Sequence, residues 1–114
     1  MCDLVVYELG MLVRADEAAQ RVPGGKLMVT LENIQKSAEV IALIGGANQY
    51  LRALGYTEHG PRHAMLVATT ARDILGSLDQ PQRVGELAAI AGSLHDIGNS
   101  VHREHHAQTG SLLA

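Results

Sequence analysis

The residue types best suited to chemistry gather near the carboxyl end of this sequence. The stretch SLHDIGNSVHREHH, residues 93–106, holds four of the six histidines in the chain. His95 and Asp96 are adjacent there, and an imidazole beside a carboxylate suits a divalent ion such as Mn, Fe, Co, Ni or Zn. Because neighbouring residues on a helix point about 100° apart, both can reach one ion most easily at a helix end, which Gly98 and Asn99 signal here. The alternative is a polar helix terminus without metal, where a histidine also suits the helix dipole.

His63 strengthens the metal hypothesis. It follows the helical spacing of apolar residues such as Leu66 and Val67, and a histidine on a core-facing stripe needs a polar partner. If two antiparallel helices are joined by the break GSLDQP, the start of the first lies beside the end of the second. That topology would bring His63 to His95 and Asp96. A hydrogen-bonded core histidine is the simpler alternative for His63.

The remaining histidines divide into two cases. His102 and His106 are spaced i, i+4, so both could face one side of a helix, whereas His105 would point away from them. We expect His106 to bind the ion and His105 to be solvated. His59 lies four residues before His63, and a structural role, or one supporting the ligands, is favoured there over direct ligation.

The rest of the chain must supply the elements that position these side chains. Its 114 residues suffice for one domain, and 46% of them are hydrophobic, with neither Trp nor Phe. A core of Leu, Ile, Val, Ala and Met suits packed helices better than sheets, and no long alternation of apolar and polar residues indicates a strand. The sequence therefore predicts an all-α fold, a bundle of four to five helices.

Helical periodicity is clear from Ser37 onward, and four helices have recognisable limits. They are expected from the N-cap Ser37 to Gly55, from the N-cap candidate Thr57 to the break GSLDQP, from about Gln82 to Ile97, and from near Val101 to the chain end. On the second helix, the residues at helical spacing with His63 are Leu66, Val67, Thr70, Ile74 and Leu78. Gly45 and Gly46 weaken the first helix by about 1 kcal/mol each relative to Ala, which indicates a kink or a close helix contact.

Residues 1–27 differ in pattern from residues 28–114. The stretch RADEAAQRVPGGK contains a Pro-Gly-Gly break and no sustained period, and a regular pattern begins only at Met28. One hypothesis is that translation starts at Met28 and that residues 1–27 are an artefact of the assigned start. A genuine N-terminal arm is the equally weighted alternative. In both cases residues 28–114 form the predicted domain.

Charge and cysteine content exclude several classes of function. The net charge of −3 argues against general nucleic-acid binding through a basic surface. Cys2 is the single cysteine, so a disulfide framework is excluded and a thiolate metal site is disfavoured. No apolar run approaches the roughly 20 residues that span a bilayer. A cytoplasmic protein without membrane association is the expectation.

Taken together, these segments resemble the HD-domain superfamily of metal-dependent phosphohydrolases. The resemblance rests on HAMLVA, AAIAGSLHDIGN and HHAQTGSLLA, which give the ordered pattern His…His-Asp…His-x-x-x-Gly over about residues 37–114. In addition, YTEHGPRHAMLVA is similar to a bacterial branch of the superfamily. The resemblance implies an all-α, HD-like bundle. The metal ligands that it implies are His63, His95 and Asp96 for one ion, with His106 for a second. Some members use a further histidine, a position open to His102 or His105.

The resemblance implies hydrolysis of a small-molecule phosphate ester or nucleotide, with water activated by one or two divalent ions. Asp96 could bridge two ions, and Asp96 and His106 are the expected catalytic residues. Arg62 or Arg103 could hold the substrate phosphate, because a guanidinium fork matches it bidentately. Either arginine could equally be a solvated surface residue.

The sequence departs from the superfamily at its C-terminal end. The family's ligand set is completed by an Asp on a later helix, but no acidic residue follows Glu104. The domain is therefore expected to be incomplete at the C-terminus or degenerate, which favours an alternative: a non-catalytic regulatory module that binds metal or nucleotide. A third interpretation is an iron-dependent oxygenase, because some HD folds carry a di-iron pair. Leu112 and Leu113 without a covering helix would favour a homo-oligomer.

Overall fold

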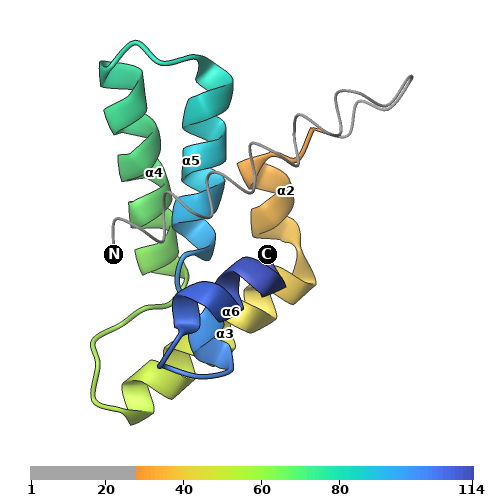
Figure 1. The fold of residues 1–114 in the computed structure, drawn as a ribbon, viewed down its shortest axis with the longest axis vertical. Coiled ribbons are helices and arrows are strands. Elements are labelled where there is room, and N and C mark those ends of the chain that lie inside the picture. Colours follow the sequence, from red (N-terminus) through yellow and green to blue (C-terminus); the bar gives the residue numbers. More distant parts are fainter. Residues whose placement is uncertain (1–27) are drawn as a thin grey trace.

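The computed structural model describes residues 28–114, and these residues fold into five α-helices and one short 3-10 helix, without a strand (Figure 1). In chain order the elements are α2 (Leu31–Lys36), α3 (Ala38–Ala53), α4 (Pro61–Ser77), α5 (Gln82–Leu94), η1 (Ile97–Ser100) and α6 (His106–Leu113). The predicted all-α bundle of four to five helices is confirmed for this part of the chain. None of the described helices is long and apolar enough to cross a membrane. The hypothesis on the origin of residues 1–27 lies outside the described residues.

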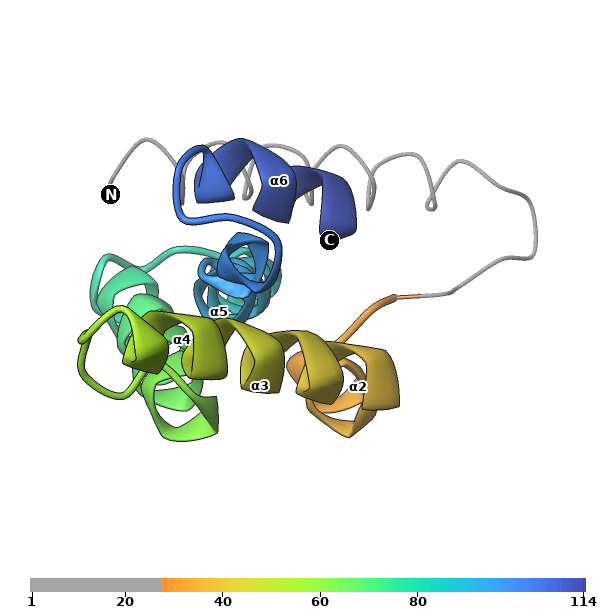
Figure 2. The ribbon, with the colours of Figure 1, turned by 90° about the horizontal axis from the view of Figure 1, so that it is seen from below.

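Helix α5 forms the centre of the described domain. Figure 2 shows it between α6 on one side and α3 with α4 on the other. Every residue of α5 from Leu87 to Leu94 is buried. A Cβ built on Gly92 would lie 3.2 Å from the backbone of Val67 in α4. The two helices are therefore in close contact, which small residues allow, and this contact fixes the antiparallel pair on which the candidate site depends.

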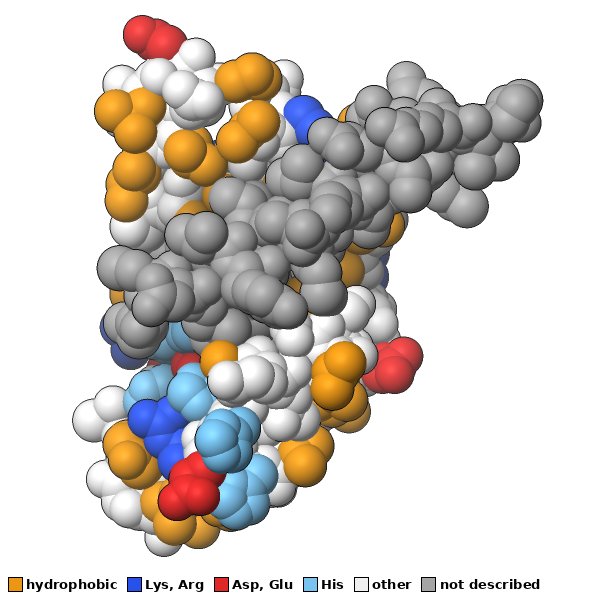
Figure 3. All heavy atoms as spheres, viewed as in Figure 1, with side chains coloured by type: hydrophobic (Ala, Val, Ile, Leu, Met, Phe, Trp, Pro, Cys, Tyr) orange, Lys and Arg blue, Asp and Glu red, His pale blue; other side chains and the backbone are white. Residues whose placement is uncertain are grey.

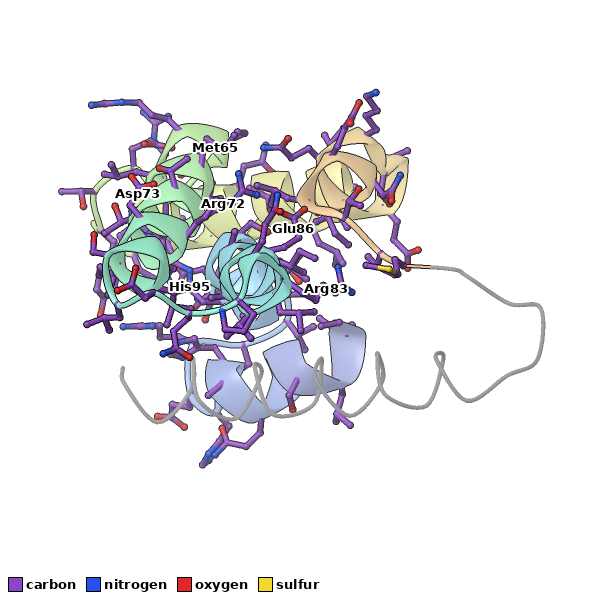
Figure 4. All side chains as sticks on the ribbon, turned by 90° about the horizontal axis from the view of Figure 1, so that it is seen from above. Met65, Arg72, Asp73, Arg83, Glu86 and His95 are labelled. Atoms are coloured by element: carbon purple, nitrogen blue, oxygen red, sulfur yellow. The ribbon has the colours of Figure 1, made fainter. Side chains whose placement is uncertain are left out.

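Glu86 on α5 joins three helices. Its Oε2 accepts a hydrogen bond from Arg72 Nη2 on α4 at 2.6 Å, and its Oε1 accepts one from the backbone N–H of Leu31 at 2.6 Å. Figure 4 shows Arg72 and Glu86 on neighbouring sides of α4 and α5. Leu31 is the first residue of α2, where an N–H has no partner within its own helix and a negative charge is favourable. Glu86 thereby holds α2 against the α4–α5 pair.

The first predicted helix agrees closely with the structure. Ser37 is the N-cap of α3, and its hydroxyl accepts a backbone N–H of the first turn at 3.4 Å. Gly55 follows the end of the helix with a φ of 87°, the left-handed conformation that favours glycine at this position. Helix α3 continues through its glycine pair, and a Cβ on Gly46 would lie 3.6 Å from Ser100 Cβ in η1. This is an ordinary van der Waals contact, and a Cβ on Gly45 would meet no atom within 4 Å.

The start of α4 differs from its prediction. The helix begins at Pro61 with Gly60 as its N-cap, so Thr57 is not the capping residue and His59 precedes the helix. Proline suits the first helical position because its missing N–H would have no partner there. The backbone N–H of Gly60 donates instead to Glu58 Oε1 at 2.6 Å.

The buried face of α4 also differs from its prediction. Leu66, Ile74 and Leu78 are 62%, 54% and 62% exposed, whereas the residues that face the core are Ala64 and Ala68. Alanines occupy the buried face because their small side chains permit the close approach of α5. Leu66, Ile74 and Leu78 therefore lie on the surface. Figure 3 shows hydrophobic side chains scattered over the end of the molecule where α4 lies.

The C-terminal elements are shorter than predicted. Helix α5 ends at Leu94, and Ile97 begins a separate 3-10 turn. The last helix starts at His106 and not near Val101. His105 has a φ of 59° in the left-handed region, and a continuous α-helix does not contain that conformation.

Candidate metal centre

The candidate site forms where α4 begins and α5 ends. His63 lies in the first turn of α4, His95 is the residue directly after α5, and Asp96 follows it. A short turn makes the two helices antiparallel neighbours (Figure 1), so the beginning of one lies beside the end of the other. The structure thus brings together the three residues that the sequence pattern selected.

Three side-chain atoms of these residues form a small triangle. His63 Nε2 lies 3.4 Å from His95 Nε2 and 3.4 Å from Asp96 Oδ2, and His95 Nε2 lies 3.0 Å from Asp96 Oδ2. Two ligand atoms that are each about 2.1 Å from one ion, at tetrahedral or octahedral angles, are roughly 3.0–3.4 Å apart. The separations therefore fit three ligands of one transition-metal ion.

Hydrogen-bond partners determine which of these atoms carry lone pairs. His95 Nδ1 lies 2.7 Å from the Gly92 carbonyl oxygen. Since a carbonyl only accepts, Nδ1 carries the hydrogen, and Nε2 of the neutral ring keeps its lone pair. Asp96 Oδ2 is buried without a hydrogen-bond partner among the described contacts, and it lies beside this nitrogen. The two lone pairs, 3.0 Å apart, repel each other unless a proton or a cation lies between them.

Protonation equilibria favour the state that binds a metal ion. Burial acts to raise the pKa of Asp96, but the neighbouring histidines, His95 first, outweigh it and hold that pKa below its ordinary value. Burial lowers the pKa of His63, the neighbouring His95 lowers it further, and Asp96 opposes this only in part. At neutral pH the carboxyl group is therefore ionised and the His63 imidazole is neutral, as ligands must be.

His59 joins the group from the segment before α4. His59, His63 and Asp96 each offer a ligand atom within 4.8 Å of the others, an arrangement that could hold a metal ion. The backbone N–H of His59 donates to Asn48 Oδ1 of α3 at 3.0 Å. Its Nδ1 lies 2.7 Å from the Thr57 carbonyl oxygen, which leaves the lone pair on Nε2. The sequence favoured a supporting role for His59, but the structure brings it close enough to be a ligand itself.

The four candidate ligands share one small cavity. It has a volume of about 10 Å³ and is lined by His59, His63, His95 and Asp96, together with apolar neighbours such as Ile97. A space of this size holds about one water molecule. The cavity therefore suits a single ion between the side chains and leaves any larger ligand to bind outside it.

The structure does not bring the last three histidines into this group. His106 Nδ1 lies 3.0 Å from the carbonyl oxygen of Arg103, His102 Nδ1 accepts from the backbone N–H of Glu104 at 3.0 Å, and His105 is exposed before α6. Because a turn and not a helix connects them, His102 and His106 do not share one helical face. Figure 3 shows histidines gathered with acidic and basic side chains at one end of the surface.

Asn99 contacts the candidate ligand Asp96, a role that the sequence did not predict. The residue is completely buried, and its Nδ2 donates to the backbone carbonyl of Asp96 at 3.1 Å and to Asp96 Oδ1 at 3.3 Å. In the sequence, Asn99 was interpreted only as part of a helix-stop signal. Its position three residues after Asp96 is the one feature that could have indicated a contact with that carboxylate. Of the two arginines considered for phosphate, Arg103 contacts Asn99, whereas Arg62 is exposed at the start of α4.

Comparison with known proteins gives limited information about this chain. No family model matches it, and no solved structure matches it. The chain is similar to the uncharacterized protein MJ1020 of Methanocaldococcus jannaschii, with 36% identity over 78 residues, covering 54% of this chain and 29% of the relative. The match thus spans less than a third of the relative's length. The resemblance to the HD superfamily therefore remains an expectation from the sequence motifs.

Proposed function

We propose that the protein is a metal-dependent phosphohydrolase of the HD type that acts on a phosphate ester or nucleotide. The observation that carries the proposal is the triangle of His63 Nε2, His95 Nε2 and Asp96 Oδ2, with edges of 3.0, 3.4 and 3.4 Å. A cation between these atoms would give the buried Oδ2 a partner. The sequence pattern supports the same assignment, since its resemblance to the HD superfamily selects these three residues.

Four side chains of the site fit one divalent transition-metal ion. His59, His63, His95 and Asp96 offer three imidazoles and one carboxylate, a donor set suited to Mn, Fe, Co, Ni or Zn. We infer that His59 is the fourth ligand of this ion. A bound ion would supply an activated water molecule and neutralise charge on a phosphoryl oxygen.

Neighbouring groups hold these ligands in the correct orientation. The Gly92 carbonyl fixes the ring of His95, and the Asn99 amide holds Asp96 Oδ1, so that Oδ2 is directed to the histidines. Outer partners of this kind raise metal affinity by about 10- to 100-fold. One ion is proposed, because the described contacts leave His106 outside the group.

Metal analysis combined with a generic hydrolysis assay tests the proposal. The purified protein is stripped with chelator, reloaded with Zn, Mn or Fe, and assayed with p-nitrophenyl phosphate and bis(p-nitrophenyl) phosphate. We expect metal uptake and hydrolysis, and we expect His95→Ala and Asp96→Ala to lose both. His105→Ala is the matched control and should retain both. A wild-type protein that takes up no metal and hydrolyses neither ester would defeat the proposal.

A non-catalytic regulatory module is the second candidate. One observation favours it: the cavity of about 10 Å³ leaves little room beside the ion. This function predicts metal uptake that depends on Asp96 but no turnover of either ester. The same measurements therefore distinguish the two candidates.

Self-association is proposed from two exposed leucines of α6. Leu112 is 86% exposed and Leu113 is 40% exposed, and exposed leucines at the end of α6 favour contact with another apolar surface. Light scattering coupled to gel filtration should give the mass of a homo-oligomer, and Leu112→Lys should lower it. A monomeric wild-type chain would contradict this proposal.

A further inference from the structure

Arg103 is linked to the candidate metal site through one buried amide group. Asn99 is completely buried, and its Nδ2 donates to Asp96 Oδ1 at 3.3 Å. On its other side, Asn99 Oδ1 accepts from Arg103 Nη1 at 3.4 Å. A single amide thus separates the carboxylate of the site from the guanidinium group. Because Asn99 is enclosed by the core, both partners are held in a fixed relation to it.

A second contact links Arg103 to the opposite side of the site. The guanidinium carbon of Arg103 lies 5.0 Å from the centre of the Tyr56 ring, a distance at which a cation and an aromatic face attract each other. Tyr56 in turn meets His59 edge to face, with ring centres 6.4 Å apart. Arg103 is therefore connected to Asp96 through Asn99 and to His59 through Tyr56, although it does not line the cavity itself.

The contacts of Arg103 leave part of its guanidinium group available. Its described hydrogen bonds all involve Nη1, which also lies 3.4 Å from His106 Nδ1. Among residues 28–114, no carboxylate forms an ion pair with Arg103, in contrast to Arg72, which pairs with Glu86 at 2.6 Å. The side chain is half-buried. Among the described residues, no hydrogen bond or ion pair uses its Nε or Nη2 donors.

We propose that Arg103 binds the phosphoryl group of the substrate, and that Asn99 and Tyr56 hold its guanidinium in position. Phosphoryl oxygens match the two parallel donors of a guanidinium fork. The small cavity between the ligands requires such an anion to bind outside it, where Arg103 lies. This inference rests on the proposed function for the identity of the anion, but phosphate binding itself can be measured without turnover.

Isothermal titration of the full-length protein with inorganic phosphate tests this role. We expect Arg103→Ala to weaken phosphate binding by about tenfold or more, and Arg103→Lys to lose part of it, because an ammonium group lacks the fork. Arg62→Ala is the matched control: this arginine is exposed on α4 and its removal should change the affinity by less than about twofold. Circular dichroism and metal content of each variant show whether the fold and the metal site persist.

The outcomes separate this inference from the proposed function. Phosphate binding that depends on Arg103 in a protein that hydrolyses no ester would support the inference while the proposed function fails. If metal uptake and hydrolysis are present but Arg103→Ala and Arg103→Lys bind phosphate as the wild type does, the inference is overturned alone. Equal losses in Arg62→Ala and Arg103→Ala, or a wild type that binds no phosphate, would also overturn it.

Discussion

Two groups of histidines lie close together in the sequence, but only one of them forms the candidate metal site. His59 and His63 lie four residues apart and reach His95 from a distant part of the sequence, and all three meet around Asp96. The group from residue 102 to residue 106 contains three histidines within five residues, but it contributes none to the cluster. The comparison teaches that closeness in sequence is a poor guide to a shared metal site.

The difference between the groups lies in what fixes each side chain. In the first group, backbone carbonyls of Thr57 and Gly92 each hold a ring nitrogen at 2.7 Å, and the close contact of α4 with α5 fixes the distances between rings. The second group lies on a turn whose last residue, His105, is left-handed. His102 and His105 are therefore exposed, whereas His106 is half-buried at the start of α6.

Removing the Asp96 carboxylate should have the largest effect on metal affinity, because the histidines of the first group meet around it. Asp96→Ala removes the anionic ligand, and we expect metal affinity to fall by roughly 100-fold or more; His95→Ala should have a similar effect. Competition with a chromogenic zinc chelator measures the change. Asp73→Ala, an exposed carboxylate on α4, is the matched control. Comparable losses for Asp73 and Asp96 would show that the ligands are misassigned.

Gly98 lies between the two groups in the sequence, and its substitution should have the next largest effect, on the stability of the fold. A Cβ at this position would lie 1.8 Å from the carbonyl oxygen of His106, so Gly98→Ala must push η1 and α6 apart. We expect a loss of roughly 2–4 kcal/mol in the free energy of unfolding, measured by urea denaturation. Gly45→Ala, where no atom lies within 4 Å, should instead gain up to about 1 kcal/mol. An unchanged midpoint for Gly98→Ala would mean that α6 does not dock here.

A pair of single substitutions sharpens the comparison directly. His59→Ala removes a candidate ligand, and we expect zinc affinity to fall by roughly tenfold. His106→Ala removes a side chain outside the cluster and should change the affinity by less than about twofold. The same chelator competition measures both variants. A greater loss for His106 than for His59 would restore the ligand set that the superfamily pattern implies and contradict the one described.

The smallest effect is expected at His105. Its φ of 59° is unfavourable for a residue with a Cβ, so His105→Gly should gain about 0.5–1 kcal/mol in stability. Zinc affinity should not change, because the side chain is exposed and outside the cluster. Thermal unfolding and metal titration of the same preparation measure both quantities. A drop in affinity would show that the second group takes part in metal binding after all.

Much of the helical framework was predictable from the sequence because its signals are local. Ser37 and Gly55 mark the limits of α3 through capping and a left-handed residue, which depend on adjacent backbone only. The antiparallel logic of two helices joined by a short turn also predicted that His63 would reach His95 and Asp96. The exposed face of α4 was not predictable, because Leu66 and Ala68 both follow helical spacing.

The sequence by itself determined which side chains could do chemistry and which segments become helices, since both follow from residue type and local periodicity. Only the tertiary structure decided which histidines converge. His59 enters the site because Asn48 of α3 binds its backbone, whereas the His106 ring faces the Arg103 carbonyl oxygen at 3.0 Å and lies outside the cluster. Such contacts join residues far apart in the chain, and they depend on which helix faces fit closely enough to exclude water.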